Sequence, residues 1–364
     1  MARTWDPRLN QISDLAYSGD TDQAAALAQS YLKENPEDPN AYFMRAMVYD
    51  WKRNLSDGPG EDLKEKSYQL YKKGNQIAFF LWEKNPDNPD ALIDLGNSYI
   101  LLGRIMTDQG KWFRAIMTAK KGPKHLEKAL ALAPERTDGL MTLGVFHYVA
   151  DNTPPAAAPF KKLFGIKGSE TEGLRELKKA LTGNHPFKND ALVALYYMHF
   201  NFDKKYTEAA KYVDLLAQKF PENPQWPFAK AEIAEKQNKE QAISAYLKVV
   251  DWCEQKHPNR CAKKFFYDSL YRAGSLAKGQ KRYDEAMAHL QKSIATGLPD
   301  QPHQYAQALI WLGEMSGDPV QAYGYFRRAA DVEGAPKELN GKAKERLAKI
   351  CEEPTPGAAT VCKS

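Results

Sequence analysis

The sequence lacks the features that mark membrane-spanning proteins and the motifs that mark common enzymes. Its 364 residues contain no apolar run close to the ~20 residues that a membrane-spanning helix requires. No HExxH metal pair, no GxSxG nucleophile turn and no phosphate-binding P-loop occurs. We therefore expect a protein that crosses no bilayer, catalyses no reaction and holds neither a cofactor nor a metal.

A strong charge of one sign is also missing. The net charge is +5, and basic and acidic residues alternate in stretches such as Glu61–Lys66, which is typical of a solvated helix face. No segment shows the aromatic-plus-glycine pattern of an RNA-binding sheet or a helix with clustered arginines. We expect no nucleic-acid partner.

Cysteine is scarce, and its placement is informative. The four cysteines fall in two local pairs, Cys253 with Cys261 and Cys351 with Cys362, and such pairs favour disulfides formed in an oxidising compartment. The first residues lack the apolar core of a signal peptide. We interpret Met1 as the start of a trimmed form and predict a periplasmic or otherwise exported protein. The alternative is a cytoplasmic protein with reduced thiols.

The first cysteine pair allows a second interpretation. Cys253, His257 and Cys261 are spaced by four, so on one continuous helix they would present two sulfurs and a nitrogen to a metal. Pro258 and Asn259 argue against such a helix, and no fourth ligand is evident. We therefore favour the disulfide.

Paired apolar stripes recur along the chain at helical spacing. In the segment Asp190–Pro221, a first stripe of Val193, Tyr196, Tyr197 and Phe200 is followed by a second of Ala209, Val213 and Leu216. Short linkers with two prolines also recur, at Asn35–Pro39, Asn85–Pro89 and Phe220–Pro224. Each linker stops one helix, and its second proline suits the first turn of the next.

This pattern resembles the tetratricopeptide repeat family over most of the chain. The resemblance implies an all-α, right-handed superhelical solenoid of about eight helical hairpins. We place this solenoid at residues 1–352, with a capping helix near Lys337–Cys351, and expect an irregular tail at residues 353–364.

Three units are longer than the usual repeat. The excess lies in Lys52–Asp62, Arg104–Lys121 and Asp151–Lys167. We expect a loop in the first and prolonged helices in the second. The third is an insert, at residues 151–168, between the helices of one repeat. We expect it to be a compact excursion anchored by Phe160, Leu163, Phe164 and Ile166.

The family resemblance implies that the first helix of each hairpin lines a concave groove. Projected onto this sequence, the groove residues are Phe43, Met47, Trp51, Ile93, Asn97, Ile100, Met141, Val145, Tyr148, Met198, Asn201, Phe202 and Tyr271. An apolar wall of this kind is unusual if it is exposed to water, so we expect a partner to cover it. The alternative is that the chain itself covers the wall, for example with the insert. Asn97 matches an asparagine that holds a peptide carboxylate in some family members, but Ile93 replaces the matching lysine. A chaperone-tail adaptor is therefore not expected.

The leading functional hypothesis is a protein-interaction scaffold that binds a protein or peptide through the groove or an outer face, in an exported envelope-associated assembly. The alternative is a carrier that holds a hydrophobic small molecule or lipid inside the superhelix. An open groove would favour the scaffold, and a closed tunnel would favour the carrier.

Overall fold

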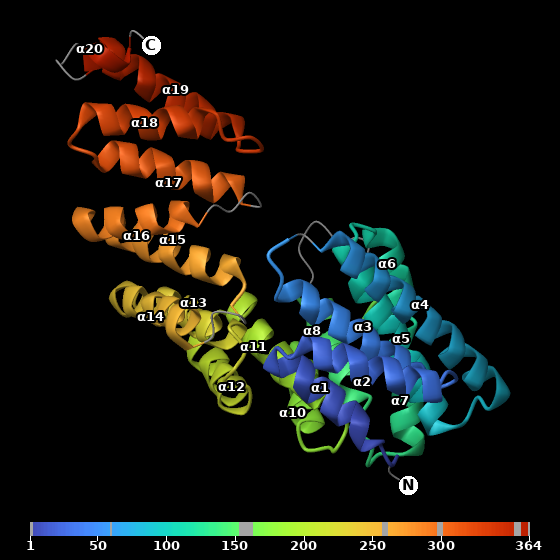
Figure 1. Ribbon diagram of the computed structural model, residues 1–364. Helices are drawn as coiled ribbons and strands as arrows, with labels where there is room; N and C mark the ends of the chain where they lie inside the picture. Colours follow the sequence, from blue (N-terminus) through green and yellow to red (C-terminus); the bar gives the residue numbers. More distant parts are fainter. Residues whose placement is uncertain are drawn as a thin grey trace. The chain divides into compact units, whose positions relative to one another are not determined.

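A computed structural model describes residues 3–58, 60–152, 163–256, 261–296, 301–352 and 358–362 (Figure 1). Over these ranges the regular elements are helices, and no strand occurs. The predicted all-α repeat fold is therefore confirmed. The described residues include no helix long and apolar enough to pass through a membrane. The chain divides into two compact units, residues Met1–Ser56 with Gly60–Asn223, and Asp57–Pro59 with Pro224–Ser364.

The first unit consists of successive antiparallel pairs of helices. The pairs are α1 (Pro7–Ser18) with α2 (Thr21–Glu34), α3 (Pro39–Asn54) with α4 (Glu61–Lys84), α5 (Pro89–Asp108) with α7 (Gly122–Leu132), α8 (Leu140–Asp151) with α10 (Glu170–Ala180), and α11 (Lys188–Asn201) with α12 (Tyr206–Lys219). A further helix, α6 (Trp112–Ala119), lies between α5 and α7 in the chain and packs on α5.

The second unit continues the same pairing. It contains α13 (Gln225–Gln237) with α14 (Lys239–Asp251), α15 (Lys263–Gly279) with α16 (Tyr283–Ala295), α17 (Pro302–Met315) with α18 (Pro319–Ala330), and the capping helix α19 (Lys337–Glu352). Figure 1 shows α15 to α19 stacked in chain order. A single π-helical turn, Trp252–Lys256, follows α14. Whether the two units form one continuous array over residues 1–352 stays a prediction.

The linker prolines act at helix starts as the sequence predicts. Asp38 and Asn88 are N-cap residues whose side chains accept hydrogen bonds from backbone N–H groups of α3 and α5, and Pro39 and Pro89 are the first residues of these helices. Proline is favoured there because its missing N–H group would have no helical partner at that position. In the third linker the helix begins one residue later, at Gln225.

The first and last hairpins of the first unit contact each other. The side-chain amide of Asn189, on α11, donates to Ser13 Oγ of α1 at 3.1 Å. Beyond α12, the Asn223 side chain donates to the backbone oxygen of Tyr17 at 2.8 Å. Because these residues are more than 170 positions apart in the chain, α1 closes the interior of this unit against its last hairpin.

Three expectations about the irregular segments need correction. The tail contains a short helix, α20 (Ala358–Val361), which contacts α18. The stretch Arg104–Lys121 prolongs α5 but also forms the separate helix α6. Leu163 is 74% exposed and so does not anchor the insert, whereas Phe164 and Ile166 are half-buried. Phe160 lies outside the described residues.

Candidate functional site

Most of the predicted groove residues are packed inside the first unit. Phe43, Met47, Trp51, Ile93, Asn97, Ile100, Met141, Tyr148 and Met198 are all buried. Val145 and Phe202 are half-buried, and Asn201 is exposed. The apolar wall inferred from the repeat pattern is therefore covered here by the chain's own side chains.

Helix α1 supplies part of this cover. The ring of Tyr17 lies 4.6 Å from that of Trp51 on α3 and 5.7 Å from that of Phe220, at the end of α12. Tyr17 is 2% exposed and Trp51 8% exposed. An aromatic side chain that is wedged between two hairpins contributes to the core, so Trp51 is not available to a partner in this structure.

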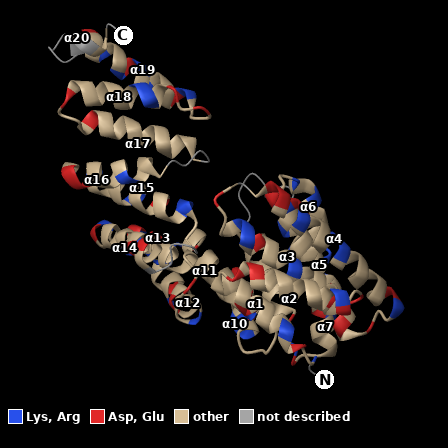
Figure 2. Cartoon of the chain, in the orientation of Figure 1, with Lys and Arg blue, Asp and Glu red and all other residues tan. Residues whose placement is uncertain are grey.

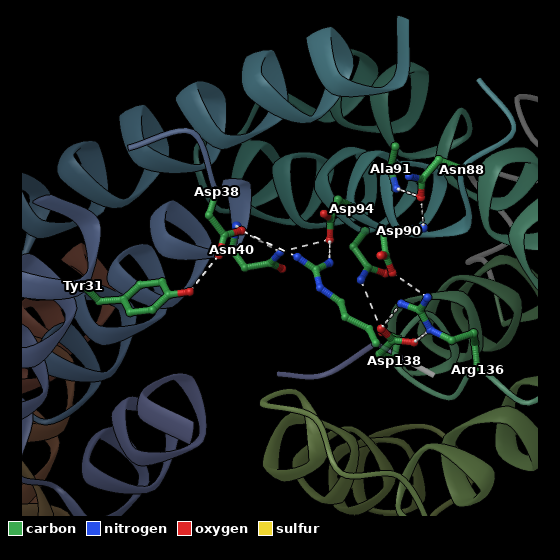
Figure 3. A network of polar contacts seen from close by, with 11 residues as sticks. Tyr31, Asp38, Asn40, Asn88, Asp90, Ala91, Asp94, Arg136 and Asp138 are labelled. Atoms are coloured by element: carbon green, nitrogen blue, oxygen red, sulfur yellow. Dashed lines mark hydrogen bonds and ion pairs between the residues drawn. The ribbon is translucent and has the colours of Figure 1, made fainter. Parts of the chain in front are cut away.

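A network of polar contacts joins the starts of α3, α5 and α8 in the first unit (Figure 3). Asn40 donates to Asp94 Oδ1 at 3.0 Å, and Arg3 donates to the same oxygen at 2.8 Å. Arg136, just before α8, binds Asp138 through two nitrogens and Asp90 through a third. Burial raises the pKa of Asp94 to about 6, against the opposing effect of Arg3.

Asn97 is part of this network and is not directed toward a groove. Its side-chain amide donates to the backbone oxygen of Asp138 at 3.3 Å, and its oxygen accepts from the hydroxyl of Thr142. Both hydrogen bonds cross from α5 to the next repeat. The network therefore connects successive hairpins, and its charged groups are satisfied by one another.

The second unit presents a different surface. Tyr271, the one predicted groove residue in this unit, is half-buried on α15. Its ring is stacked on Trp311 of α17, with centroids 5.6 Å apart and planes 16° apart, and on Tyr267 of its own helix at 6.3 Å. We call the surface formed by Tyr271 and Trp311 with the polar residues near them the Tyr271 face; these polar residues are Glu232, Glu235, Asp268, Arg272, Lys278, Gln301, Gln304 and Glu314.

Two basic residues of α15 carry ion pairs near the two rings. Arg272 Nη1 lies 2.9 Å from Glu235 Oε2 of α13, and its Nη2 lies 3.4 Å from Glu232 Oε1. Lys278 Nζ lies 5.4 Å from the centre of the Trp311 ring and 3.8 Å from Glu314. Burial raises the pKa of Glu232 above its usual range, so this side of the face is partly desolvated.

Three acceptor oxygens on this face have no hydrogen-bond partner within the described residues. They are Asp268 Oδ1, Gln301 Oε1 and Gln304 Oε1, all buried at the atom level. Gln301 donates to the other Asp268 oxygen at 3.4 Å, and burial raises the pKa of Asp268. Because unsatisfied buried acceptors are costly, these oxygens would gain from an N–H donor, which could reach them only if the side chains that cover them moved aside.

Sequence reasoning found Tyr271 but missed Trp311, Asp268 and Gln304. Gln304 and Trp311 are seven positions apart, and Asp268 precedes Tyr271 by three, so each pair shares a helix face. This spacing could have indicated that the members of each pair lie close together. It could not predict the stacking of the Tyr271 and Trp311 rings, because that depends on how α15 and α17 pack.

Both predicted disulfides, Cys253–Cys261 and Cys351–Cys362, are present. The first uses the two sulfurs that the metal interpretation required, and His257 lies outside the described residues. Across the described ranges, no group of three or more His, Cys, Asp or Glu side chains is arranged to hold a metal ion.

Comparison with known proteins gives one match at the level of sequence families. Residues 9–57 match the tetratricopeptide repeat. The match begins within α1 and ends shortly after α3. A comparison with curated proteins finds no match.

Solved structures with similar folds were also found. Yeast Tom70 is 14% identical, with a TM-score of 0.40, and the alignment covers 96% of this chain and 90% of that one. A human IFIT1 dimer with PPP-AAAA is 18% identical, with a TM-score of 0.47, and the alignment covers 87% of this chain and 69% of that one.

Proposed function

We propose that this chain, whose residues 9–57 match the tetratricopeptide repeat, is a non-enzymatic scaffold that binds a polypeptide partner through the Tyr271 face. The observation that carries this proposal is the combination of stacked, half-buried rings with acceptor oxygens that lack donors. Aromatic platforms bind apolar side chains, and buried acceptors bind N–H groups. A peptide offers both in one segment.

The chemistry of the face also indicates the kind of peptide. Asp268 is a partly desolvated carboxylate with one unpartnered oxygen. A lysine or arginine of the partner would stabilise the ionised Asp268 carboxylate, which has lost hydration because it is buried. We therefore expect peptides in which a basic residue lies next to an apolar or aromatic one.

A peptide-display selection against the intact, oxidised protein tests this proposal. The expected result is enrichment of basic-apolar peptides whose affinity falls about tenfold in Asp268→Asn, since a hydrogen bond to a charged group contributes ~1.5–3 kcal/mol. Asp284→Asn is the matched control, because Asp284 is exposed on α16, the second helix of its pair.

A second variant pair tests the aromatic platform. Tyr271→Ala should weaken the same peptides, whereas Tyr283→Ala should not, because Tyr283 is 49% exposed on α16 and away from the face. Helical circular dichroism checks that each variant is folded. Selected peptides that bind all four variants as tightly as the unmodified protein would rule out the Tyr271 face as the binding surface.

We also propose that the protein works in an oxidising, exported compartment, as part of an envelope-associated assembly. The two disulfides support the compartment. Thiol titration of protein from its native source, denatured without reductant, should detect no free thiol. Four reactive thiols would contradict export.

The alternative function, a carrier of a hydrophobic small molecule or lipid, receives less support. The apolar residues that would line its tunnel are largely buried against the chain itself in the first unit. A ligand would have to displace α1, whose Tyr17 is buried against Trp51 and Phe220. Such displacement exposes apolar core surface and is therefore unfavourable.

A further inference from the structure

Two of the segments that exceed the usual repeat length meet at the surface of the first unit. Phe113, on α6, lies 5.9 Å from Phe164 of the insert, measured between ring centroids, and their planes are 67° apart. Lys120, just after α6, lies 5.1 Å above the Phe164 ring. The excess residues of two different repeats therefore build one local surface.

Helix α6 packs on α5 through small residues. A Cβ atom added at Gly103 of α5 would lie 2.7 Å from the Cβ of Ala119 and 2.9 Å from the backbone oxygen of Ala115. The two helices therefore touch closely through glycine and alanine. This leaves the large apolar side chains of α6 to face elsewhere.

Two of these side chains, and one from the insert, are exposed. Trp112 is 64% exposed, Phe113 is 60% exposed, and Leu163 of the insert is 74% exposed. We call Trp112, Phe113, Leu163 and Phe164 the Trp112 patch. Single exposed apolar residues are common on protein surfaces, but three large ones from two adjoining segments mark an interaction site.

The charged residues in the segment that carries Trp112 and Phe113 are all basic. From residue 109 to residue 126 the sequence carries Lys111, Arg114, Lys120, Lys121 and Lys124 and no acidic residue. Figure 2 shows basic positions on and beside α6, with acidic positions near them. Of the acidic groups closest in the chain, Asp108 pairs with Arg53 and Arg104, and Glu127 lies 3.8 Å from His147. Glu65 of α4 accepts a hydrogen bond from Gln109, so one carboxylate lies beside the basic segment.

We propose that the Trp112 patch binds the surface of a membrane that contains anionic lipids. Exposed Trp and Phe side chains on a basic helix, with an exposed Leu on the adjoining segment, are the composition that inserts into the boundary between headgroups and acyl chains. The surrounding lysines and arginine match the negative charge of the headgroups. Stacking on nucleic-acid bases accounts for the rings but not for Leu163, which has no π-face and is the most exposed of the four.

Vesicle flotation with the full-length oxidised protein tests the proposal. Vesicles of phosphatidylcholine mixed with phosphatidylglycerol should carry the protein upward, and vesicles of phosphatidylcholine alone should carry little of it. High salt should weaken the binding, because ions screen the attraction between lysines and headgroups. The Trp112→Ala, Phe113→Ala double variant should reduce partitioning by about tenfold or more, since it removes most of the insertable apolar area.

The matched control is Phe80→Ala on α4. Phe80 is 54% exposed, and the Lys84 ammonium lies 4.1 Å from the centre of the Phe80 ring. Phe80 therefore resembles the patch residues in its exposure and in having a basic neighbour. Its loss should leave partitioning unchanged. Equal flotation with both kinds of vesicle, or equal flotation of the double variant, would refute the proposal. It would also be refuted if the patch variants abolished only self-association or binding of single-stranded RNA.

Discussion

The ring of Tyr17 packs against the indole of Trp51 with centroids 4.6 Å apart. Tyr17 belongs to the first helix of the chain and Trp51 to the third, and Phe220, beyond α12, also packs against Tyr17. One aromatic residue therefore joins the beginning and the end of the first unit. Trp51, which the repeat pattern assigns to a partner-binding wall, contributes to stability instead.

Replacing Trp51 by alanine should lower the free energy of unfolding by about 3–5 kcal/mol, because it removes a large buried ring and leaves a cavity. Urea denaturation followed by circular dichroism measures the change. Trp112→Ala is the control, and it should alter the same quantity by no more than ~0.5 kcal/mol, since Trp112 is 64% exposed. Equal effects of the two variants would contradict the placement of Trp51 in the core.

The pH dependence of stability should change in Asp190→Asn. Burial raises the pKa of Asp190 from 3.8 to about 6, and Tyr17 donates a hydrogen bond to its carboxyl group. The folded protein holds a proton that the unfolded chain releases near pH 4, so this group's stabilising contribution is lost as the pH rises from about 4 to about 6.

Asparagine keeps an acceptor for Tyr17 but cannot ionise. At neutral pH, Asp190→Asn should therefore raise the free energy of unfolding, by up to about 3 kcal/mol. Below pH 4 the two proteins should be similar. Denaturation curves across this pH range measure the difference, and an asparagine variant that is less stable at neutral pH would contradict the expected sign.

Two helical glycines should respond in opposite directions to alanine. Helices α8 and α10 touch at Gly173, where an added Cβ would lie 2.6 Å from the backbone oxygen of Gly144 and 2.8 Å from the backbone nitrogen of Tyr148. Backbone cannot move aside without separating the helices, so Gly173→Ala should destabilise the protein by about 1–3 kcal/mol.

Gly341 provides the comparison. It lies in α19, and an added Cβ there would meet nothing within 4 Å. Gly341→Ala should stabilise the protein by about 0.5–1 kcal/mol, because alanine loses less conformational freedom in a helix. Thermal unfolding measures both changes, and destabilisation by both substitutions would contradict the open environment of Gly341.

The second disulfide should hold the end of the chain against the capping helix. Helix α20 has four residues, too few to be stable alone, and Cys362 links its end to Cys351 on α19. In the Cys351→Ser, Cys362→Ser double variant, amide hydrogen exchange in residues 358–361 should become fast. Exchange near Cys253 should not change, because the other disulfide is intact. Unchanged protection of α20 would show that its contacts with α18 suffice.

Local sequence signals determined the repeats. The apolar periodicity and the linkers Asn35–Pro39 and Asn85–Pro89 predict where helices begin and how they pair, because N-caps and prolines act on the turn beside them. The two cysteine pairs were predictable for a similar reason, since each joins residues that are close in the chain.

Tertiary packing decided which apolar faces remain accessible. Residues such as Trp51 and Tyr271 carry the same signal in the sequence, a large ring on the first helix of a hairpin, yet Trp51 is buried under Tyr17 and Tyr271 stays half-exposed beside Trp311. The difference comes from contacts between residues that are far apart in the chain, such as Asn223 with Tyr17. The apolar periodicity of a sequence reports on one helix and the helices next to it in the chain. Whether an apolar face is covered depends instead on which distant segment of the chain packs against it.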